Sequence, residues 1–179
     1  MNLTLALCSS LKYPPKIPSS VINMKQTFAG CRMLIEAPEI PVNVTDMTST
    51  FNSCSSLEEP PTIPENVTIL YDTFGSCSVL KYAPAIPSKV VTMKNTFNGC
   101  YALTKASEIP SSVTNMEYTF NGCQKLEGEL IINASPTTYT GCFASAAGIK
   151  GTGIILKGSS TVLNELVATI DIGKVTVGN

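Results

Sequence analysis

The sequence predicts an α/β repeat fold, a solenoid of equal coils that each hold a short parallel strand and a short helix. The main observation is an interval of 23 residues that separates six of the seven cysteines from one another. Neighbouring positions keep the same interval, and each coil joins a helix-like spacing to a proline-containing stretch that is unsuited to a helix. The six cysteines are Cys8, Cys31, Cys54, Cys77, Cys100 and Cys123.

Other residues follow the cysteines at fixed distances, so the interval is a structural repeat. Three residues before each cysteine stands a phenylalanine, or Leu5 in the first coil, and three residues after it stands a leucine. An Ile-Pro pair, a valine and a methionine or leucine complete the period. These positions predict a buried ladder formed by Phe28, Phe51, Phe74, Phe97 and Phe120 together with Cys31, Cys54, Cys77, Cys100 and Cys123.

The first part of each coil is predicted to be a helix of one or two turns. Met24, Phe28 and Cys31 stand at positions i, i+4 and i+7, which places them on one helical face. Asn23 precedes the methionine and is a favourable N-terminal cap. Gly30 precedes the cysteine and supplies the left-handed conformation that ends a helix. Most other coils repeat this arrangement.

The second part of each coil, from the leucine to the valine, is predicted to be extended. Parallel strands of successive coils would then lie about 4.8 Å apart. Pro38, Pro61 and Pro84 have no amide hydrogen for such a ladder, so the strands should be short or interrupted there. The regular ladder runs through the Ile-Pro segment, the Val-x-x-Met segment or both.

The repeats are predicted to occupy residues 1–142, with the last coil shortened, and residues 143–179 to form a C-terminal cap. Tyr139 and Cys142 repeat the Phe-x-x-Cys spacing, but Cys142 follows Cys123 by only 19 residues. The cap is expected to be a strand over 153–157, a helix over 160–169 and a strand over 174–177. The alternative is that these residues begin another domain.

The pattern Cys-x-x-Leu…Ile-Pro-x-x-Val…Phe-x-x-Cys resembles the 23-residue, BspA-like (Treponema-type) class of leucine-rich repeat, found mostly in bacterial surface proteins and in some protozoa. The resemblance implies a leucine-rich-repeat right-handed superhelix that serves as a ligand-binding surface, often an adhesive one. The chain departs from the usual form by its Thr-Phe pair, its methionine and its extra prolines, which affect the regularity of the strands. No catalytic site of the family corresponds to residues of this chain.

The composition favours a scaffold over an enzyme. The chain has no histidine, so catalytic triads with histidine and histidine zinc sites are excluded. Its net charge of -1 argues against a nucleic-acid partner, which needs a basic surface. No apolar run reaches the roughly 20 residues of a membrane span. We therefore expect no enzymatic activity, no cofactor, no nucleic acid and no membrane insertion.

The cysteines allow two sharper interpretations. Equivalent cysteines of adjacent coils would lie about 5 Å apart, close enough by distance alone for disulfides, and an array of thiolates could bind a soft metal. Against both stand the odd number of cysteines, their parallel inward direction and the lack of a Cys-x-x-Cys pair. We favour reduced, buried thiols that act as small apolar side chains.

A candidate binding stripe is predicted at positions four, five and eight residues after the cysteines, where the residue type varies from coil to coil. Equivalent side chains of successive coils form columns, which here give a basic, an acidic and again a basic zone with two tyrosines. The alternative is an ordinary solvated flank. The stripe consists of Tyr13, Lys16, Glu36, Glu39, Glu58, Glu59, Lys81, Tyr82, Lys105 and Glu108.

The resemblance and the stripe lead to two hypotheses about function. The first is a non-enzymatic protein- or glycan-binding module, adhesive in character, of an extracellular or cell-surface bacterial protein. The second is a structural spacer or an assembly element of a cell envelope or phage, without a ligand of its own. Because Met1 aligns with the repeat methionine, we expect the N-terminal edge to pack on further repeats or on a partner.

Overall fold

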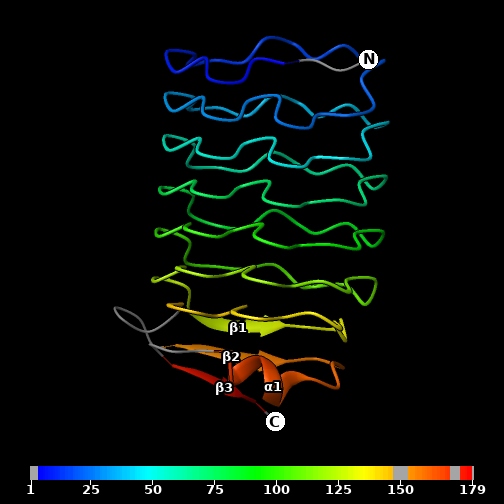
Figure 1. The fold of residues 1–179 in the computed structure, drawn as a ribbon, viewed down its shortest axis with the longest axis vertical. Helices are drawn as coiled ribbons and strands as arrows, with labels where there is room; N and C mark the ends of the chain where they lie inside the picture. Colours follow the sequence, from blue (N-terminus) through cyan, green and yellow to red (C-terminus); the bar gives the residue numbers. More distant parts are fainter. Residues whose placement is uncertain (1–3, 147–152, 170–173, 179) are drawn as a thin grey trace.

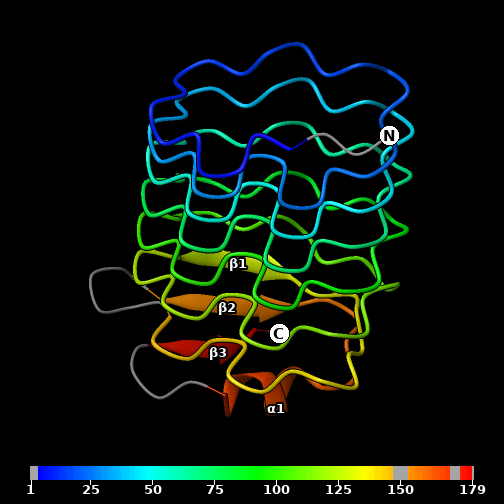
Figure 2. The same ribbon diagram turned by 45° about the horizontal axis from the view of Figure 1, so that its top comes forward.

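In the computed structural model the chain forms a stack of similar coils, and the structure describes residues 4–146, 153–169 and 174–178. Figure 1 shows the coils one below the other from the N-terminal to the C-terminal end, and Figure 2 shows them tilted as stacked loops. Hydrogen bonds join residues of neighbouring coils, as from Phe28 N to Thr50 O (2.9 Å) and from Thr68 N to Thr45 O (2.9 Å). One sequence repeat is therefore one coil.

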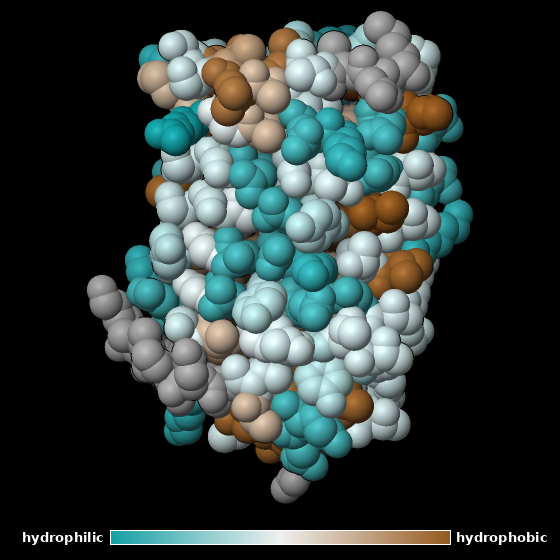
Figure 3. Space-filling view, viewed as in Figure 1, coloured by the Kyte–Doolittle hydropathy of each residue, from teal (hydrophilic) through white to brown (hydrophobic). Residues whose placement is uncertain are grey.

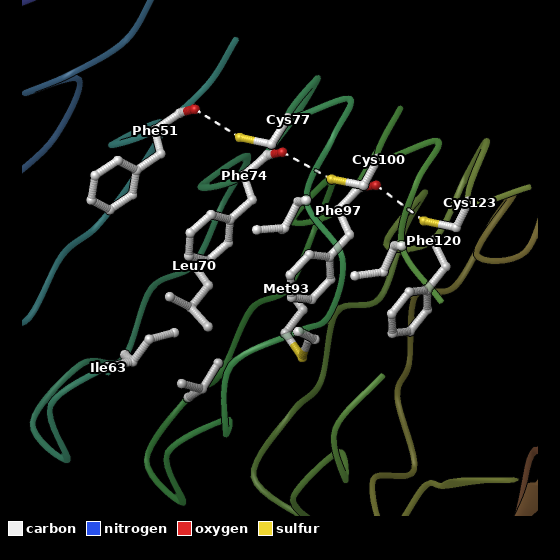
Figure 4. Close-up of a cluster of buried hydrophobic side chains, with 14 of the residues drawn as sticks. Phe51, Ile63, Leu70, Phe74, Cys77, Met93, Phe97, Cys100, Phe120 and Cys123 are labelled. Carbon is white, nitrogen blue, oxygen red and sulfur yellow. Dashed lines mark hydrogen bonds between the residues drawn. The ribbon is translucent and has the colours of Figure 1, made fainter. Parts of the chain in front are cut away.

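The repeated apolar positions fill the inside of every coil. All ten residues of the predicted Phe and Cys ladder are fully buried. The phenylalanine rings of successive coils lie almost parallel, with centroids 5.5 to 5.7 Å apart, which confirms the predicted stacking. Figure 4 shows this column beside the cysteine column. Each coil thus packs mainly on its neighbours, and the core is a continuous rod of side chains.

The segment from methionine to cysteine is not helical, so the predicted short helix in each coil is wrong. The amides of Met24, Gln26 and Phe28 donate to carbonyls of the next coil, while amides between them close tight turns, as from Thr27 N to Met24 O (3.0 Å). An α-helix would need these amides for its own i to i−4 bonds. Gln26 (φ 56°) and Gly30 (φ 75°) are also left-handed. Bonds between coils therefore replace the helix.

Parallel pairing within the described repeats is mostly limited to single-residue bridges. The continuous column lies in the Val-x-x-Met segment, two residues after the repeat valine, which decides between the alternatives for most of the stack. Prolines remove amides from the Ile-Pro segment, so the ladder there is interrupted as predicted. The column consists of Asn23, Asp46, Ile69, Thr92, Asn115 and Thr138, and further bridges join Tyr82 to Lys105 and Ile109 to Ile132.

The 23-residue register continues beyond Cys123, so the prediction of a shortened last coil is wrong. The ring of Phe143 stacks on Phe120, 23 residues earlier, with centroids 5.5 Å apart. Cys142 accordingly takes the place of the repeat threonine, and Ala146 takes the place of the repeat cysteine. The Phe-x-x-Cys spacing misled because Tyr139 occupies the methionine position. The division of the chain at residue 142, like the right-handed superhelix, stays a prediction.

The regular strands lie at the C-terminal end of the stack, where three form a parallel sheet in the order β1-β2-β3. Strand β2 (Ile154–Lys157) confirms the strand expected at 153–157, and β3 (Val175–Val177) confirms the one expected at 174–177. Strand β1 (Gly128–Ile131) belongs to the last repeats and pairs with β2. Helix α1 (Leu163–Val167) is shorter than the predicted 160–169 and buries Leu166.

Candidate functional site

The charged stripe predicted from the sequence lies on the outside of the coils. All ten of its residues are exposed. The backbone stacks them in columns: Lys81 N donates to Glu58 O (3.0 Å), Thr104 N donates to Lys81 O (2.9 Å), and a parallel bridge joins Tyr82 to Lys105. The stripe is thus a geometric feature of the surface, and its role in binding stays a prediction.

Some charges of the stripe neutralise one another across coils. Lys81 Nζ lies 2.5 Å from Glu58 Oε2, and this hydrogen bond raises the pKa of the lysine. Desolvation, followed by the nearby Glu59, raises the pKa of the Tyr82 hydroxyl. Asn133 Nδ2 donates to Glu108 Oε1 (2.5 Å). Such exposed contacts contribute little to stability, so the remaining carboxylates stay available to a partner.

A row of hollows runs beside the stripe, across the proline-containing segments. Hollows of about 910, 490, 320 and 280 Å³ follow one another along the described surface and share lining residues: Pro38 joins the first two, Pro61 the next pair, and Ile86 the last pair. We call these four hollows the proline trough. Because each continues into the next, the trough crosses five successive coils.

A fifth hollow of about 640 Å³ adjoins the trough at Pro61 and is lined by three carboxylates. We call it the acidic hollow. Glu58 and Glu59 both line it, although neighbours in an extended segment are expected to point to opposite faces. Glu36 of the preceding coil is the third carboxylate. The acidic zone of the stripe therefore faces one concave surface.

Sequence reasoning missed the proline trough. The prolines were interpreted only as residues that interrupt strands, yet their repetition at fixed positions was a usable signal. Rigid rings at equivalent positions of successive coils make a column of apolar surface, because proline fixes its backbone and presents no amide hydrogen. Figure 3 shows a different kind of surface on one face of the stack, where hydrophilic residues gather along the middle.

The buried cysteines donate hydrogen bonds to the backbone of the preceding coil. Cys77 Sγ donates to Phe51 O (3.1 Å) and Cys100 Sγ donates to Phe74 O (3.1 Å), as Figure 4 shows. All seven cysteines, which lie in the described part of the chain, are free thiols. Burial raises the pKa of the Cys77 and Cys100 thiols well above the ordinary value. The thiols therefore stay protonated and hold carbonyls that would otherwise be unpaired.

The repeat threonines serve in the same way. Thr73 Oγ1 donates to Met47 O (2.8 Å) and Thr96 Oγ1 donates to Leu70 O (2.8 Å), each in the preceding coil. Within the described residues every buried side-chain nitrogen and oxygen has a hydrogen-bond partner. The described part of the chain also contains no cluster of three or more His, Cys, Asp or Glu residues suited to a metal ion. The polar interior thus joins the coils.

The face opposite in character to the trough carries the tight turns. Lys94 Nζ lies 2.9 Å from Glu117 Oε2, and the hydrogen bond from Lys94 lowers the pKa of the carboxyl group. Burial raises the pKa of Asp72, although Asn52 Nδ2 (3.0 Å) and Ser49 Oγ (3.3 Å) donate to it. These groups are engaged with one another, so this face offers fewer free charges than the acidic hollow.

Comparisons with known proteins address the family. A family model described as "BspA type Leucine rich repeat region (6 copies)" matches residues 5–104 and 48–165. Among solved structures, a leucine-rich repeat protein from Bacteroides ovatus is similar at 20% sequence identity and a TM-score of 0.47. That match covers 88% of this chain and 48% of the other, so this chain spans about half the length of that protein. No curated protein matches the chain. No helix in the described ranges is long and apolar enough to cross a membrane.

Proposed function

Because the chain belongs to the BspA-type leucine-rich repeat family, we propose that it is a non-enzymatic module that binds a protein or glycan ligand, adhesive in character, on a bacterial cell surface or in a secreted protein. Repeats of this family serve in protein interaction and adhesion and are often surface-associated. The extracellular location rests on that association.

One observation carries the proposal. The positions that repeat from coil to coil are buried and engaged in packing or in bonds between coils, whereas the ten variable positions of the charged stripe are all exposed. A repeated surface on which only the exposed residues vary suits recognition, since side chains of successive coils present different chemistry at a regular spacing. The adjoining proline trough and acidic hollow add concave surface to this stripe.

A structural spacer is the second candidate, and the ion pairs favour it. Lys81 engages Glu58 and Asn133 engages Glu108, so part of the stripe is satisfied within the stack itself. The continuous phenylalanine column would give such a spacer stiffness along its length. In this case the module positions another domain or partner and has no ligand of its own.

Binding measurements distinguish the two functions. The chain is tested against immobilised extracellular matrix proteins and a glycan array, together with a variant that combines Glu58→Lys and Glu59→Lys. We expect a ligand whose affinity falls about tenfold or more on charge reversal, because complementary charge at an interface determines specificity. A matched variant with Glu117→Lys and Glu165→Lys should bind normally. Unchanged binding by the first variant would remove the stripe from the function, and failure to bind any ligand would favour the spacer.

A further inference from the structure

The proline trough is short of internal hydrogen bonds. In the described repeats no backbone hydrogen bond connects the Pro38–Pro41 stretch to the equivalent stretches of the coils before and after it. Elsewhere in the coils such bonds are regular, as from Met47 N to Ile69 O (3.0 Å). Peptide groups along the trough are therefore free to pair with a ligand, and proline and isoleucine side chains provide apolar contact beside them.

The trough has the length of a short extended peptide. It crosses five coils, which are four steps of about 4.8 Å, so its length is about 20 Å. Six extended residues span about the same distance, at about 3.3 Å each. A compact domain would contact only part of such a row of hollows, whereas an extended segment can follow it from coil to coil.

The charge around the trough is one-sided. The residues that line the trough and the acidic hollow include a single basic residue, Lys16. Of the carboxylates, Glu58 is paired with Lys81 and Glu108 accepts a bond from Asn133. The carboxylates number six: Glu36, Glu39, Glu58, Glu59, Glu65 and Glu108. A cationic occupant is therefore favoured over a neutral or anionic one.

We propose that the proline trough and the acidic hollow bind an extended, basic peptide segment of a protein partner, with apolar or proline residues in the trough and lysine or arginine side chains on Glu36, Glu39 and Glu59. This inference rests on the proposed binding function and names its partner class. The peptide backbone meets the unpaired peptide groups of the trough, and its cations replace water around the three carboxylates.

A fluorescent peptide of five Pro-Arg pairs is a direct probe. We expect measurable binding in fluorescence anisotropy, weakened by salt at about 0.5 M. A peptide of five Pro-Glu pairs should not bind. A variant with Glu36→Gln, Glu39→Gln and Glu59→Gln should lose about tenfold in affinity. The matched variant with Glu117→Gln, Glu129→Gln and Glu165→Gln loses the same charge outside the trough and should bind like the wild type.

The shape of the site is tested separately. Thr62 is exposed between two hollows of the trough, and Thr62→Trp should obstruct the peptide and weaken its binding about tenfold. Thr114→Trp, at an exposed position outside the trough, should have no effect. Absence of Pro-Arg binding, equal binding of both peptides or equal binding by both glutamine variants would overturn the inference. If charge reversal still abolishes binding to a matrix protein or glycan, the proposed function survives that failure.

Discussion

Two residues of each coil adopt the left-handed conformation, four positions apart, and this determines the path of the tight turns. Glycine occupies the second position in three coils, but Ser53 (φ 61°) and Ser76 (φ 60°) occupy it in two others. A side chain in this conformation costs about 1 to 2 kcal/mol, because Cβ approaches a carbonyl oxygen. The stack accepts that cost where bonds to the next coil need the turn, as from Ser76 N to Asn98 O (2.7 Å).

Ser76→Gly should therefore stabilise the protein. We expect the free energy of unfolding to rise by about 0.5 kcal/mol, since relief of the left-handed strain exceeds the larger chain entropy of glycine in the unfolded state. Urea denaturation with an unchanged m-value would measure it. Ser78→Gly, at a position without positive φ, should lower the stability by about the same amount. A loss of stability in Ser76→Gly would contradict this explanation of the turns.

The structural element of this molecule is the column rather than the helix or strand. Phenylalanine rings, thiols and hydroxyls each recur in every coil, and each contacts its equivalent or the backbone one coil away. Seven residues make a marginal helix in isolation, because nucleation is unfavourable. Columns gain stability from each added coil, so they prevail over the local helical preference.

Phe74 tests the aromatic column, since its ring stacks on Phe51 and on Phe97 at 5.6 and 5.7 Å. Phe74→Ala should lower the free energy of unfolding by about 3 to 5 kcal/mol. Phe74→Leu keeps most of the apolar volume, as Leu5 does in the first coil, and should lower it less, because mainly the ring contacts of about 0.5 to 1.5 kcal/mol per pair are lost. Denaturant melts measure both. Unchanged stability in Phe74→Ala would exclude the column as a source of stability.

At the scale of the whole molecule, six buried thiols link stability to pH. Burial raises their pKa in the folded state above the model value of 9.0. Above pH 9 the unfolded chain loses thiol protons that the folded chain keeps, so ionisation favours unfolding. The thiols' contribution is fully present below that pH and decreases as the pH rises. The six are Cys31, Cys54, Cys77, Cys100, Cys123 and Cys142.

We expect the free energy of unfolding to fall above pH 9, by about 1.4 kcal/mol per pH unit for each thiol that stays protonated only when folded. Urea melts under reducing conditions at several alkaline pH values measure this slope. Cys100→Ala should reduce the slope by about 1.4 kcal/mol per pH unit. Cys8→Ala, which removes an exposed thiol, should keep the wild-type slope. Equal slopes in both variants would show that the buried thiols do not determine the alkaline behaviour.

The sequence by itself determined the coil, its length and its interior, because burial of Phe, Cys, Leu and Met at each period leaves a signal that needs no structure. It also indicated the exposed stripe, since variation between coils marks positions without a packing role. The left-handed glycines at Gly30, Gly99 and Gly122 were predicted correctly. The family followed from the same pattern and is confirmed by the family model.

Only the tertiary structure decided how each coil bonds to the next. The spacing of Met24, Phe28 and Cys31 fits a helix, but their amides and side chains are used between coils, and such partners lie 22 to 26 residues away. The place of Phe143 in the stack likewise depended on packing, because a local motif around Tyr139 and Cys142 imitated the repeat. The proline trough arises from equivalent residues of five coils. Local sequence cannot show it, since hydrogen bonds and concave surfaces between coils form only when the coils are stacked.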